Sequence, residues 1–337
     1  MTALALARSW RPKTFSELIG QDHVVKALTH ALDQGRLHHA WLFTGTRGVG
    51  KTTISRIMAK ALNCTGVDGS GKMTSEPCGK CPACMEIDAG RFVDYIEMDA
   101  ASNRGVDDMA QLLEKAMYAP SSARFKVYMI DEVHMLTGHA FNAMLKTLEE
   151  PPPHVKFILA TTDPQKIPVT VLSRCLQFNL RPMAAQTIVE HLQHVLPAEQ
   201  IESDLQSLRL LARAARGSMR DALSLTDQAI AYCAQQLHAD GVRDMLGLVS
   251  QEPVFQLMTH LAHSQAQEAL QVAQHIHKIK SEKNASWGDF LILLRSRTHL
   301  SSIEKAFRDS GIPCDSPRQG GLLKTLEAED LVALLSV

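Results

Sequence analysis

Several features are scarce or absent in this sequence, and each absence excludes a class of protein. The 337 residues carry almost no net charge, since 35 lysines and arginines balance 36 aspartates and glutamates, which excludes a histone-like basic protein. A local basic face, and with it DNA binding, remains compatible with that balance. No apolar run approaches the roughly 20 residues of a membrane-spanning helix. Internal repeats and long low-complexity segments are also absent.

The sequence also shows no targeting signal at its N-terminus. The first ten residues are partly apolar, but Arg8, Arg11 and Lys13 lie close by and no cleavage site is visible. We therefore expect a cytoplasmic protein without a membrane partner. Seven cysteines in such a compartment are expected to be metal ligands or free thiols rather than disulfides.

The order of predicted elements indicates an α/β fold followed by a helical module. Hydrophobic residues make up 45% of the chain, which is ample for the two or three domains that its length predicts. Strands are expected at 41–44, 93–98, 126–130 and 155–161, and helices at 24–32, 52–62, 106–117 and 141–148. Strands alternating with helices predict a mostly parallel sheet. From about residue 182 strand signals vanish, and helices are expected at 187–196, 204–213 and 219–234.

A phosphate-binding loop is predicted where the first strand meets the next helix. The residues GTRGVGKT at 45–52 fit the pattern G-x-x-x-x-G-K-[ST] in the strand–loop–helix context that this motif requires. Glycines allow backbone N–H groups to surround phosphate oxygens, and the helix N-terminus adds its positive end. Lys51 is expected to reach the β- and γ-phosphates, and the Thr52 hydroxyl to ligate Mg²⁺. The alternative is a glycine-rich turn that binds nothing.

An acidic pair ends the strand predicted at 126–130. Asp131 and Glu132 follow this apolar run directly. Beside a phosphate loop, the aspartate is expected to help hold Mg²⁺ and the glutamate to polarise the attacking water. Taken alone, such a pair is more often a helix cap or a surface turn.

Four cysteines form a second constellation. Cys78, Cys81 and Cys84 give two overlapping C-x-x-C spacings, and Cys64 precedes them by thirteen intervening residues. Four thiolates suit a structural Zn²⁺ and leave no open position for catalysis. The alternative is four unconnected cysteines in a flexible loop, because the spacer at 66–73 is rich in glycine. The other three cysteines are interpreted as small buried residues: Cys175, Cys233 and Cys314.

Seven short motifs follow one another in order: RPKTF at 11–15, GTRGVGKT at 45–52, DEVH at 131–134, LEEPP at 148–152, ATTD at 160–163, SRC at 173–175 and GSMRD at 217–221. Together they resemble the gamma/tau subunits of bacterial DNA polymerase III clamp loaders, which are AAA+ ATPases. The resemblance covers about residues 4–245 and continues weakly to about 277. It implies an α/β AAA+ P-loop NTPase fold with a parallel sheet, an inserted zinc module at the cysteine cluster, and a helical lid.

The resemblance also implies which residues surround the nucleotide. Arg11 and Pro12 would lie near the adenine and ribose. Thr162, in preference to Thr161, would be the sensor-1 residue beside the γ-phosphate. The full set expected to bind the nucleotide is Arg11, Pro12, Gly45, Thr46, Arg47, Gly48, Val49, Gly50, Lys51, Thr52 and Thr53. The residues expected to act in hydrolysis are Lys51, Asp131, Glu132, Thr162, Arg174 and Arg220.

Two arginines in this set would make hydrolysis depend on assembly. By resemblance, Arg174 is the arginine finger that reaches a neighbouring subunit's ATP site, and Arg220 is the sensor-2 arginine of the lid. A finger supplied by a neighbour stabilises charge on the transferring phosphoryl group. The implied function is an ATP-driven subunit, with Mg²⁺ and Zn²⁺, that opens a sliding clamp and loads it on primed DNA. The implied partners are other loader subunits in a hetero-oligomeric ring, the clamp, DNA and the polymerase III holoenzyme, whose polymerase chemistry belongs to another subunit.

The resemblance breaks toward the C-terminus. The residues WGDFLILLRSR at 287–297, with those that follow to 337, resemble a fragment of superfamily 1 DNA helicases that lacks a phosphate loop. We therefore expect a composite chain or, alternatively, a divergent collar domain. The predicted organisation is an ATPase core at 1–181 with a zinc module at about 64–84, a lid at 182–245, collar-like helices at 246–280 and the helicase-like fragment at 285–337.

Two other functions compete with clamp loading. An incomplete collar would leave a scaffold that binds ATP but does not assemble or turn it over. A related AAA+ protein, such as a Holliday junction branch-migration motor, would share the phosphate loop. The cysteine cluster and the SRC motif at 173–175 argue against that motor.

Overall fold

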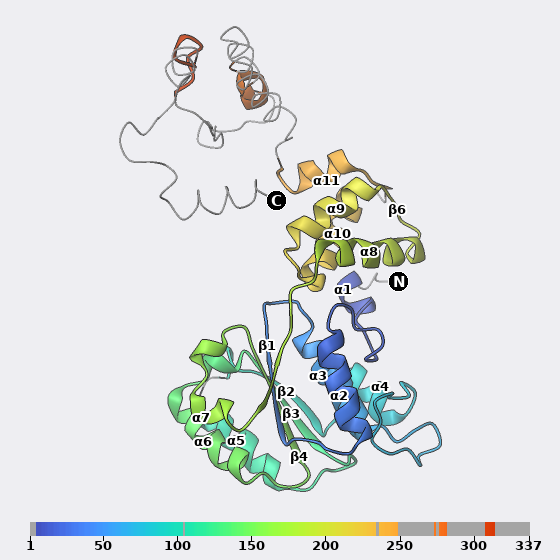
Figure 1. Cartoon of the computed structure of the whole chain (residues 1–337), viewed down its shortest axis with the longest axis vertical. Coiled ribbons are helices and arrows are strands. Elements are labelled where there is room, and N and C mark those ends of the chain that lie inside the picture. Colours follow the sequence, from blue (N-terminus) through green and yellow to red (C-terminus); the bar gives the residue numbers. More distant parts are fainter. Residues whose placement is uncertain are drawn as a thin grey trace. The chain divides into compact units, whose positions relative to one another are not determined.

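The computed structural model describes residues 5–103, 105–233, 236–248, 273, 276–281 and 307–313. The chain divides into two units, Met1–Leu248 and Val249–Val337. All helices and strands with assigned bounds lie in the first unit (Figure 1). No helix among the described residues is both long and apolar enough to cross a membrane.

A five-stranded parallel sheet forms the centre of the first part of this unit; the parallel sheet was predicted, but only four of its five strands were. Its strands are β1 (Ala40–Thr44), β2 (Tyr95–Asp99), β3 (Lys126–Asp131), β4 (Val155–Thr161) and β5 (Leu176–Asn179), in the spatial order β2-β3-β4-β1-β5. The register pairs Asp99 with Asp131 and Thr44 with Thr161. Because all strands are parallel, these polar residues meet at one edge of the sheet, where ligands bind in open α/β folds.

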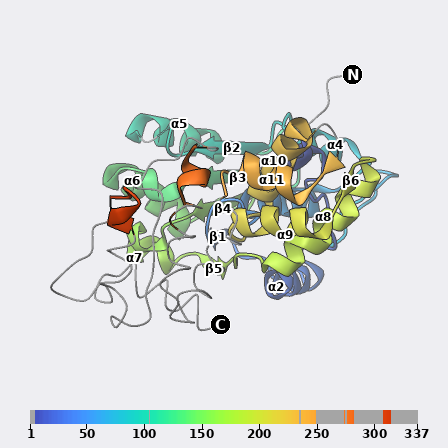
Figure 2. The ribbon, with the colours of Figure 1, turned by 90° about the horizontal axis from the view of Figure 1, so that it is seen from above.

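Helices cover both faces of the sheet, and side chains alternate between the two cores (Figures 1 and 2). On one face lie α2 (Asp22–Asp33) and α3 (Lys51–Asn63), with α4 (Pro82–Asp88) beside α3; on the other lie α5 (Val106–Met117), α6 (Gly138–Glu149) and α7 (Val169–Leu172). Trp41 and Phe43 of β1 pack toward the first group, whereas Leu42 packs toward the second. This alternation is the period of two that a strand imposes. Short 3₁₀ turns follow β3 and β4: η1 (Val133–Met135) and η2 (Pro164–Lys166).

The lid is a separate helical layer with its own core. It comprises α8 (Ala185–Ala198), α9 (Leu205–Ala214), α10 (Met219–Tyr232) and α11 (Ala239–Met245). Leu192, Leu211 and Leu223 are buried together in this core. The short N-terminal helix α1 (Leu6–Ser9) joins it, because Leu6 is buried there and its N–H donates to Asp227 Oδ2 at 2.9 Å. Helix α1 therefore packs with the lid, whereas Phe15 and Leu18, which follow it, are buried in a core of the sheet.

Some predicted elements differ from the structure. Strands were not expected after residue 182, but the two-residue strands β6 (Glu202–Ser203) and β7 (Gln236–Leu237) pair there in parallel. Two-residue strands are too short to show a hydrophobic period in the sequence. They pair only because the lid helices bring the two segments together. Helix α4 was not predicted: it begins at Pro82, between the last two cysteines of the cluster, and continues to Asp88. The collar helices and helicase-like fragment expected at 246–280 and 285–337 fall largely outside the described residues.

Candidate active site

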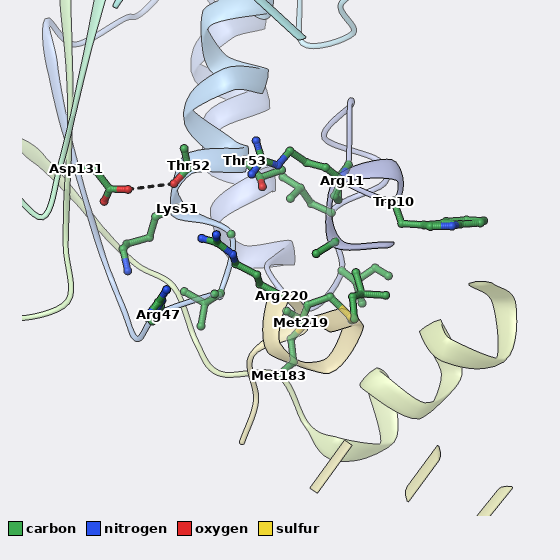
Figure 3. Close-up of a pocket in the computed structure, with 18 of the residues that line it drawn as sticks. Trp10, Arg11, Arg47, Lys51, Thr52, Thr53, Asp131, Met183, Met219 and Arg220 are labelled. Atoms are coloured by element: carbon green, nitrogen blue, oxygen red, sulfur yellow. Dashed lines mark hydrogen bonds between the residues drawn. The ribbon is translucent and has the colours of Figure 1, made fainter. Parts of the chain in front are cut away.

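A cavity of about 410 Å³ lies where the phosphate loop, the N-terminal segment and the lid meet (Figure 3). Its lining comprises Ala7, Trp10, Arg11, Pro12, Leu18, Ile19, Arg47, Gly48, Val49, Gly50, Lys51, Thr52, Thr53, Asp99, Ala101, Asp131, Glu132, Met183, His191, Met219, Arg220 and Leu223. Charged residues of the phosphate loop and of the strand ends form one end of the cavity. Apolar and aromatic residues of the N-terminal segment and of the lid form most of the other end. A polyphosphate with an aromatic base has this distribution of charge and apolar surface.

The phosphate loop reaches the N-terminus of α3 through glycines in left-handed conformations. Gly50 caps the helix with φ 107°, which L residues rarely adopt. Gly48 also has positive φ, and a Cβ added there would lie 1.9 Å from Ser218 Oγ at the start of α10. The loop therefore approaches the lid closely, and only glycine fits.

Lys51 is folded back onto its own loop. Its ammonium group donates to the carbonyl oxygens of Gly45 at 2.7 Å and Thr46 at 3.0 Å. Burial lowers the pKa of Lys51, while nearby Glu132 and Asp131 act in the opposite direction. The ammonium group of Lys51 would bind charged phosphate oxygens more strongly than these neutral carbonyl oxygens, because charge-assisted hydrogen bonds are stronger.

Thr52 and Asp131 form the arrangement expected for a magnesium site. The Thr52 hydroxyl donates to Asp131 Oδ2 at 3.2 Å, and the Glu132 N–H donates to Asp131 Oδ1 at 3.0 Å (Figure 3). Burial raises the pKa of Asp131, although Glu132 N–H, Lys51 and Thr52 oppose that effect in part. A hydroxyl beside a desolvated carboxylate fits a hard cation that prefers oxygen ligands.

Glu132 is held by the end of the adjacent strand. Its Oε2 atom accepts hydrogen bonds from the Thr162 N–H at 3.2 Å and from the Thr162 hydroxyl at 2.8 Å. The same oxygen lies 3.4 Å from His134 Nδ1, which also contacts Thr161 Oγ1 at 2.9 Å. Glu132 has a left-handed backbone with φ 46°, an uncommon conformation for this residue. The carboxylate is therefore fixed in position before any ligand enters.

The arginines divide between the cavity and a separate surface. Arg47 and Arg220 line the cavity from the loop and from α10, and Arg11 lines it from the N-terminal segment (Figure 3). Burial lowers the pKa of Arg11, and Arg56 and Arg220 lower it further, against the effect of Glu97. Arg174 does not line this cavity; it pairs with Glu149 and donates to the Thr170 carbonyl at 2.6 Å.

The four predicted zinc ligands converge. The Sγ atoms of Cys64, Cys78, Cys81 and Cys84 all lie within 4.8 Å of one another. Tetrahedral zinc with Zn–S bonds of about 2.3 Å needs sulfurs about 3.8 Å apart, so this cluster needs little adjustment to bind the ion. Backbone N–H groups of Gly66, Cys78, Lys80 and Cys81 donate to cluster sulfurs at 3.3 to 3.5 Å. Backbone N–H groups that donate to the sulfurs stabilise thiolates, so the cluster fits Zn²⁺.

The structure brings together most of the residues that the sequence predicted. Four predicted residues do not line the cavity: Gly45, Thr46, Thr162 and Arg174. Gly45 and Thr46 bind Lys51, Thr162 binds Glu132, and Arg174 lies elsewhere. Sequence reasoning missed part of the lining: Ala7, Trp10, Leu18, Ile19, Asp99, Ala101, Met183, His191, Met219 and Leu223. Of these, only Asp99 carried a signal, as a carboxylate ending a predicted strand.

Family models match three consecutive parts of the chain. The model described as "DNA polymerase III, delta subunit" matches residues 20–184. The model for the ATPase lid domain of the DNA polymerase III clamp loader subunit matches residues 187–235. The model for domain III of DNA polymerase III subunits gamma and tau matches residues 237–333.

Relatives of known name agree with these models. DNA polymerase III subunit tau of Salmonella typhimurium is 47% identical over 335 residues, which are 98% of this chain and 51% of the relative. Subunit tau of Escherichia coli is 54% identical over 271 residues, 80% of this chain and 41% of the relative. Subunit gamma of Buchnera aphidicola from Acyrthosiphon pisum is 45% identical over 298 residues, 88% of this chain and 80% of the relative. The chain thus spans about half the length of the tau relatives.

Solved structures add information on the fold alone. The Thermotoga maritima RuvB Holliday junction branch migration motor aligns with a TM-score of 0.54 at 18% identity, covering 96% of this chain and 98% of that one. This likeness supports the predicted AAA+ P-loop fold with a helical lid. At that identity it carries no functional assignment.

The matches also bear on the C-terminal part and on the family. The domain III model includes most of the segment in which the sequence suggested a helicase-like fragment, and the Salmonella alignment covers 98% of the chain. These matches assign the segment to gamma and tau and give the helicase interpretation no support; the exact domain boundaries remain predictions.

Because the chain covers 80% of a gamma subunit to which it is 45% identical, it belongs to the gamma/tau family of DNA polymerase III subunits.

Proposed function

We propose that this chain is an ATP-hydrolysing clamp loader subunit that opens a sliding clamp and loads it on primed DNA for the DNA polymerase III holoenzyme. The observation that carries the proposal is the cavity with Lys51, the Thr52–Asp131 pair and the Glu132–Thr162 pair at one end and apolar walls at the other. Its occurrence in a gamma/tau family chain favours ATP as the ligand.

The residues would divide the work of hydrolysis. The loop N–H groups and Lys51 would bind the β- and γ-phosphates, while Thr52 and Asp131 would hold Mg²⁺, which neutralises phosphate charge. Glu132 would orient the attacking water, with Thr162 fixing the carboxylate. Arg220 would contact the γ-phosphate from the lid, so that the position of the lid would depend on whether ATP is bound. Arg11 and Pro12 would line the adenosine end.

The position of Arg174 supports the proposal that hydrolysis depends on assembly with other subunits. Arg174 lies outside its own chain's cavity and its side chain is partly exposed, so it could reach a neighbouring subunit's site by leaving its ion pair with Glu149. We propose that other loader subunits form a hetero-oligomeric ring with this chain, so that hydrolysis proceeds only in the assembled ring. The clamp and primed DNA would be its substrates, with DNA gripped through the phosphate backbone in the cytoplasm. The zinc would be structural.

Lys51→Ala tests the nucleotide site directly. The variant should lose ATP hydrolysis almost completely while its circular dichroism spectrum and melting temperature stay near those of the wild type. Lys146→Ala removes an exposed lysine of α6 outside the cavity and should leave hydrolysis unchanged. Turnover that persists in Lys51→Ala would overturn the assignment of the phosphate loop. Intact ATP binding with no turnover in the wild type, even with partner subunits, would indicate the alternative of a scaffold.

A further inference from the structure

An ion pair between a buried lysine and a half-buried aspartate connects the cysteine cluster to the N-terminal segment of the nucleotide cavity. The Lys60 side chain is 1% exposed, and its ammonium group donates to Asp88 Oδ1 at 2.6 Å and to the Lys13 carbonyl at 2.7 Å. Lys60 belongs to α3, the helix that begins at Lys51, and Asp88 is the last residue of α4. One cation therefore joins three parts of the chain that are distant in sequence.

The Asp88 end of this pair is anchored by the cysteine cluster. Cys81 caps the N-terminus of α4 and Cys84 lies in its first turn. Cys84 and Asp88 are four residues apart, so they lie on the same face of the helix. A single metal ion bound by Cys81 and Cys84 would fix the start of α4. Because Asp88 lies one turn later, the ion would also fix the position of the Asp88 carboxylate.

The Lys13 end of the connection directly follows residues of the cavity wall. Lys13 follows Arg11 and Pro12, which line the apolar end of the cavity. On the other side of these residues, Trp10 Nε1 donates to Glu199 Oε1 of the lid at 2.7 Å, and its ring meets those of His191 and His194 edge-on. The strap Arg11–Lys13 is thus held by the lid at one end and by Lys60 at the other.

The Lys60–Asp88 pair positions the groups around it more than it stabilises the fold. Removing a charge from water is costly, and apolar residues of similar size often replace a buried ion pair without loss of stability. A side chain that only filled the space between α3 and α4 would need no charge. Here the ammonium group selects one placement of the Lys13 carbonyl and one of the Asp88 carboxylate.

We propose that Lys60 and Asp88 are positioning residues that couple metal occupancy of the cysteine cluster to recognition of the adenosine part of ATP. With a metal bound, Cys81 and Cys84 would fix the start of α4; Asp88 would then hold Lys60, and Lys60 would hold the strap at the cavity. The side-chain bonds of Lys60 reach Lys13 and Asp88 and not the phosphate loop at 45–52, so we expect the phosphate end of the cavity to change much less than the adenosine end. The inference rests on the proposed function, because it takes ATP as the ligand of the cavity.

The test compares two ligands that share phosphates but not adenosine. Magnesium complexes of ATP and of inorganic tripolyphosphate are titrated into the full-length chain by calorimetry. Asp88→Ala should weaken ATP binding about fivefold to tenfold, within the usual range of coupling between sites, and leave tripolyphosphate binding within about twofold. Asp68→Ala is the matched control, because this exposed carboxylate of the same cysteine segment bonds only locally to Ser70.

A second variant guards against misfolding, and metal removal completes the test. Lys60→Met with Asp88→Leu removes both charges together and should show the same selective loss for ATP. Stripping the metal from the wild type should weaken ATP binding by the same factor, whereas the double variant should show no further change. Equal weakening of both ligands, or wild-type ATP affinity in Asp88→Ala and in the double variant, would overturn the inference. Failure of the wild type to bind ATP would instead overturn the proposed function.

Discussion

The Glu132 carboxylate accepts two hydrogen bonds from Thr162, one from its N–H at 3.2 Å and one from its hydroxyl at 2.8 Å. The two residues follow the neighbouring strands β3 and β4, so the sheet itself sets the distance between them. Glu132 has a left-handed backbone, a conformation that costs of order 1 kcal/mol or more for a non-glycine residue. The contacts with Thr162 offset that strain and fix the carboxylate that is proposed to orient water.

Thr162→Val should lower the rate of hydrolysis more than it lowers ATP affinity. The valine keeps the shape and the backbone N–H but removes the hydroxyl donor, so the carboxylate loses the shorter of its two bonds. We expect kcat to fall about tenfold to a hundredfold, less than the roughly 10²- to 10⁴-fold contribution of a group that itself transfers a proton, because Thr162 acts through Glu132. The Kd for ATP should change less than about threefold. Steady-state kinetics and equilibrium binding on the same preparation measure both.

Thr162→Ser provides the matched control for that change. It retains the hydroxyl, and kcat should stay within about threefold of the wild type. If serine and valine reduce kcat equally, the hydroxyl is not what positions Glu132, and Thr161, which contacts His134, becomes the better candidate for the sensor.

Arg174→Ala should leave its own chain's ATP binding unchanged but reduce hydrolysis at a neighbour's site. The side chain does not line the cavity of its own chain, so Kd should not move. Removal of an arginine finger costs about 10³-fold or more in the rate of phosphoryl transfer. Hydrolysis by assemblies that contain the variant beside wild-type partner subunits measures the effect.

Glu149→Gln distinguishes a finger from a structural arginine. It removes the charge that pairs with Arg174 and keeps the size of the side chain. If Arg174 only stabilised α6 against α7, both variants would lower the melting temperature and neither would change hydrolysis selectively. That result would contradict the role in a neighbour's site.

Asp94 should contribute stability that disappears at low pH. This fully buried carboxylate accepts hydrogen bonds from the N–H groups of Ser121, Ser122 and Ala123 at 2.9 to 3.0 Å. Burial raises its pKa, but the backbone donors and Lys126 outweigh burial, and the net pKa is lowered. A lowered folded pKa gives stability that is present above the unfolded value of about 3.9 and lost as pH falls through the folded value.

Asp94→Ala therefore should cost about 3 kcal/mol of unfolding free energy at pH 7, because three N–H groups lose a charged acceptor. The difference from the wild type should shrink as pH falls below about 4. Urea unfolding of both proteins between pH 7 and pH 3 measures it, with Asp68→Asn as an exposed control. A difference independent of pH would show that the loss comes from packing and not from the charge.

The sequence predicted those parts of the fold that depend on local patterns. The helix α5 at Val106–Met117 matches its predicted range because its apolar residues follow a helical period. The strand β4 at Val155–Thr161 matches because it is a short, mostly apolar run between turn residues, and all seven of its residues are buried. The loop at 45–52 was predictable since its spacing and flanking elements follow from one short stretch. The cysteine cluster was predictable from ligand spacing, and its geometry fits four-coordinate metal.

The rest of the site depends on contacts between distant segments. Nothing near Trp10 in the sequence indicates that its indole would bond to Glu199 of the lid. Nothing in the sequence distinguished Lys60 or Asp88 from ordinary surface residues, and their pairing arises because α4 packs on α3. Such pairings arise from tertiary structure, for which a single sequence carries no periodic signal.

The most direct measurement is ATP hydrolysis by this chain with its proposed partner subunits and the sliding clamp, with and without primed DNA. A working loader subunit predicts strong stimulation when clamp and primed DNA are both present, and loss of that stimulation in Lys51→Ala. Low hydrolysis that neither clamp nor DNA changes, despite intact ATP binding, would contradict clamp loading and leave an ATP-binding scaffold.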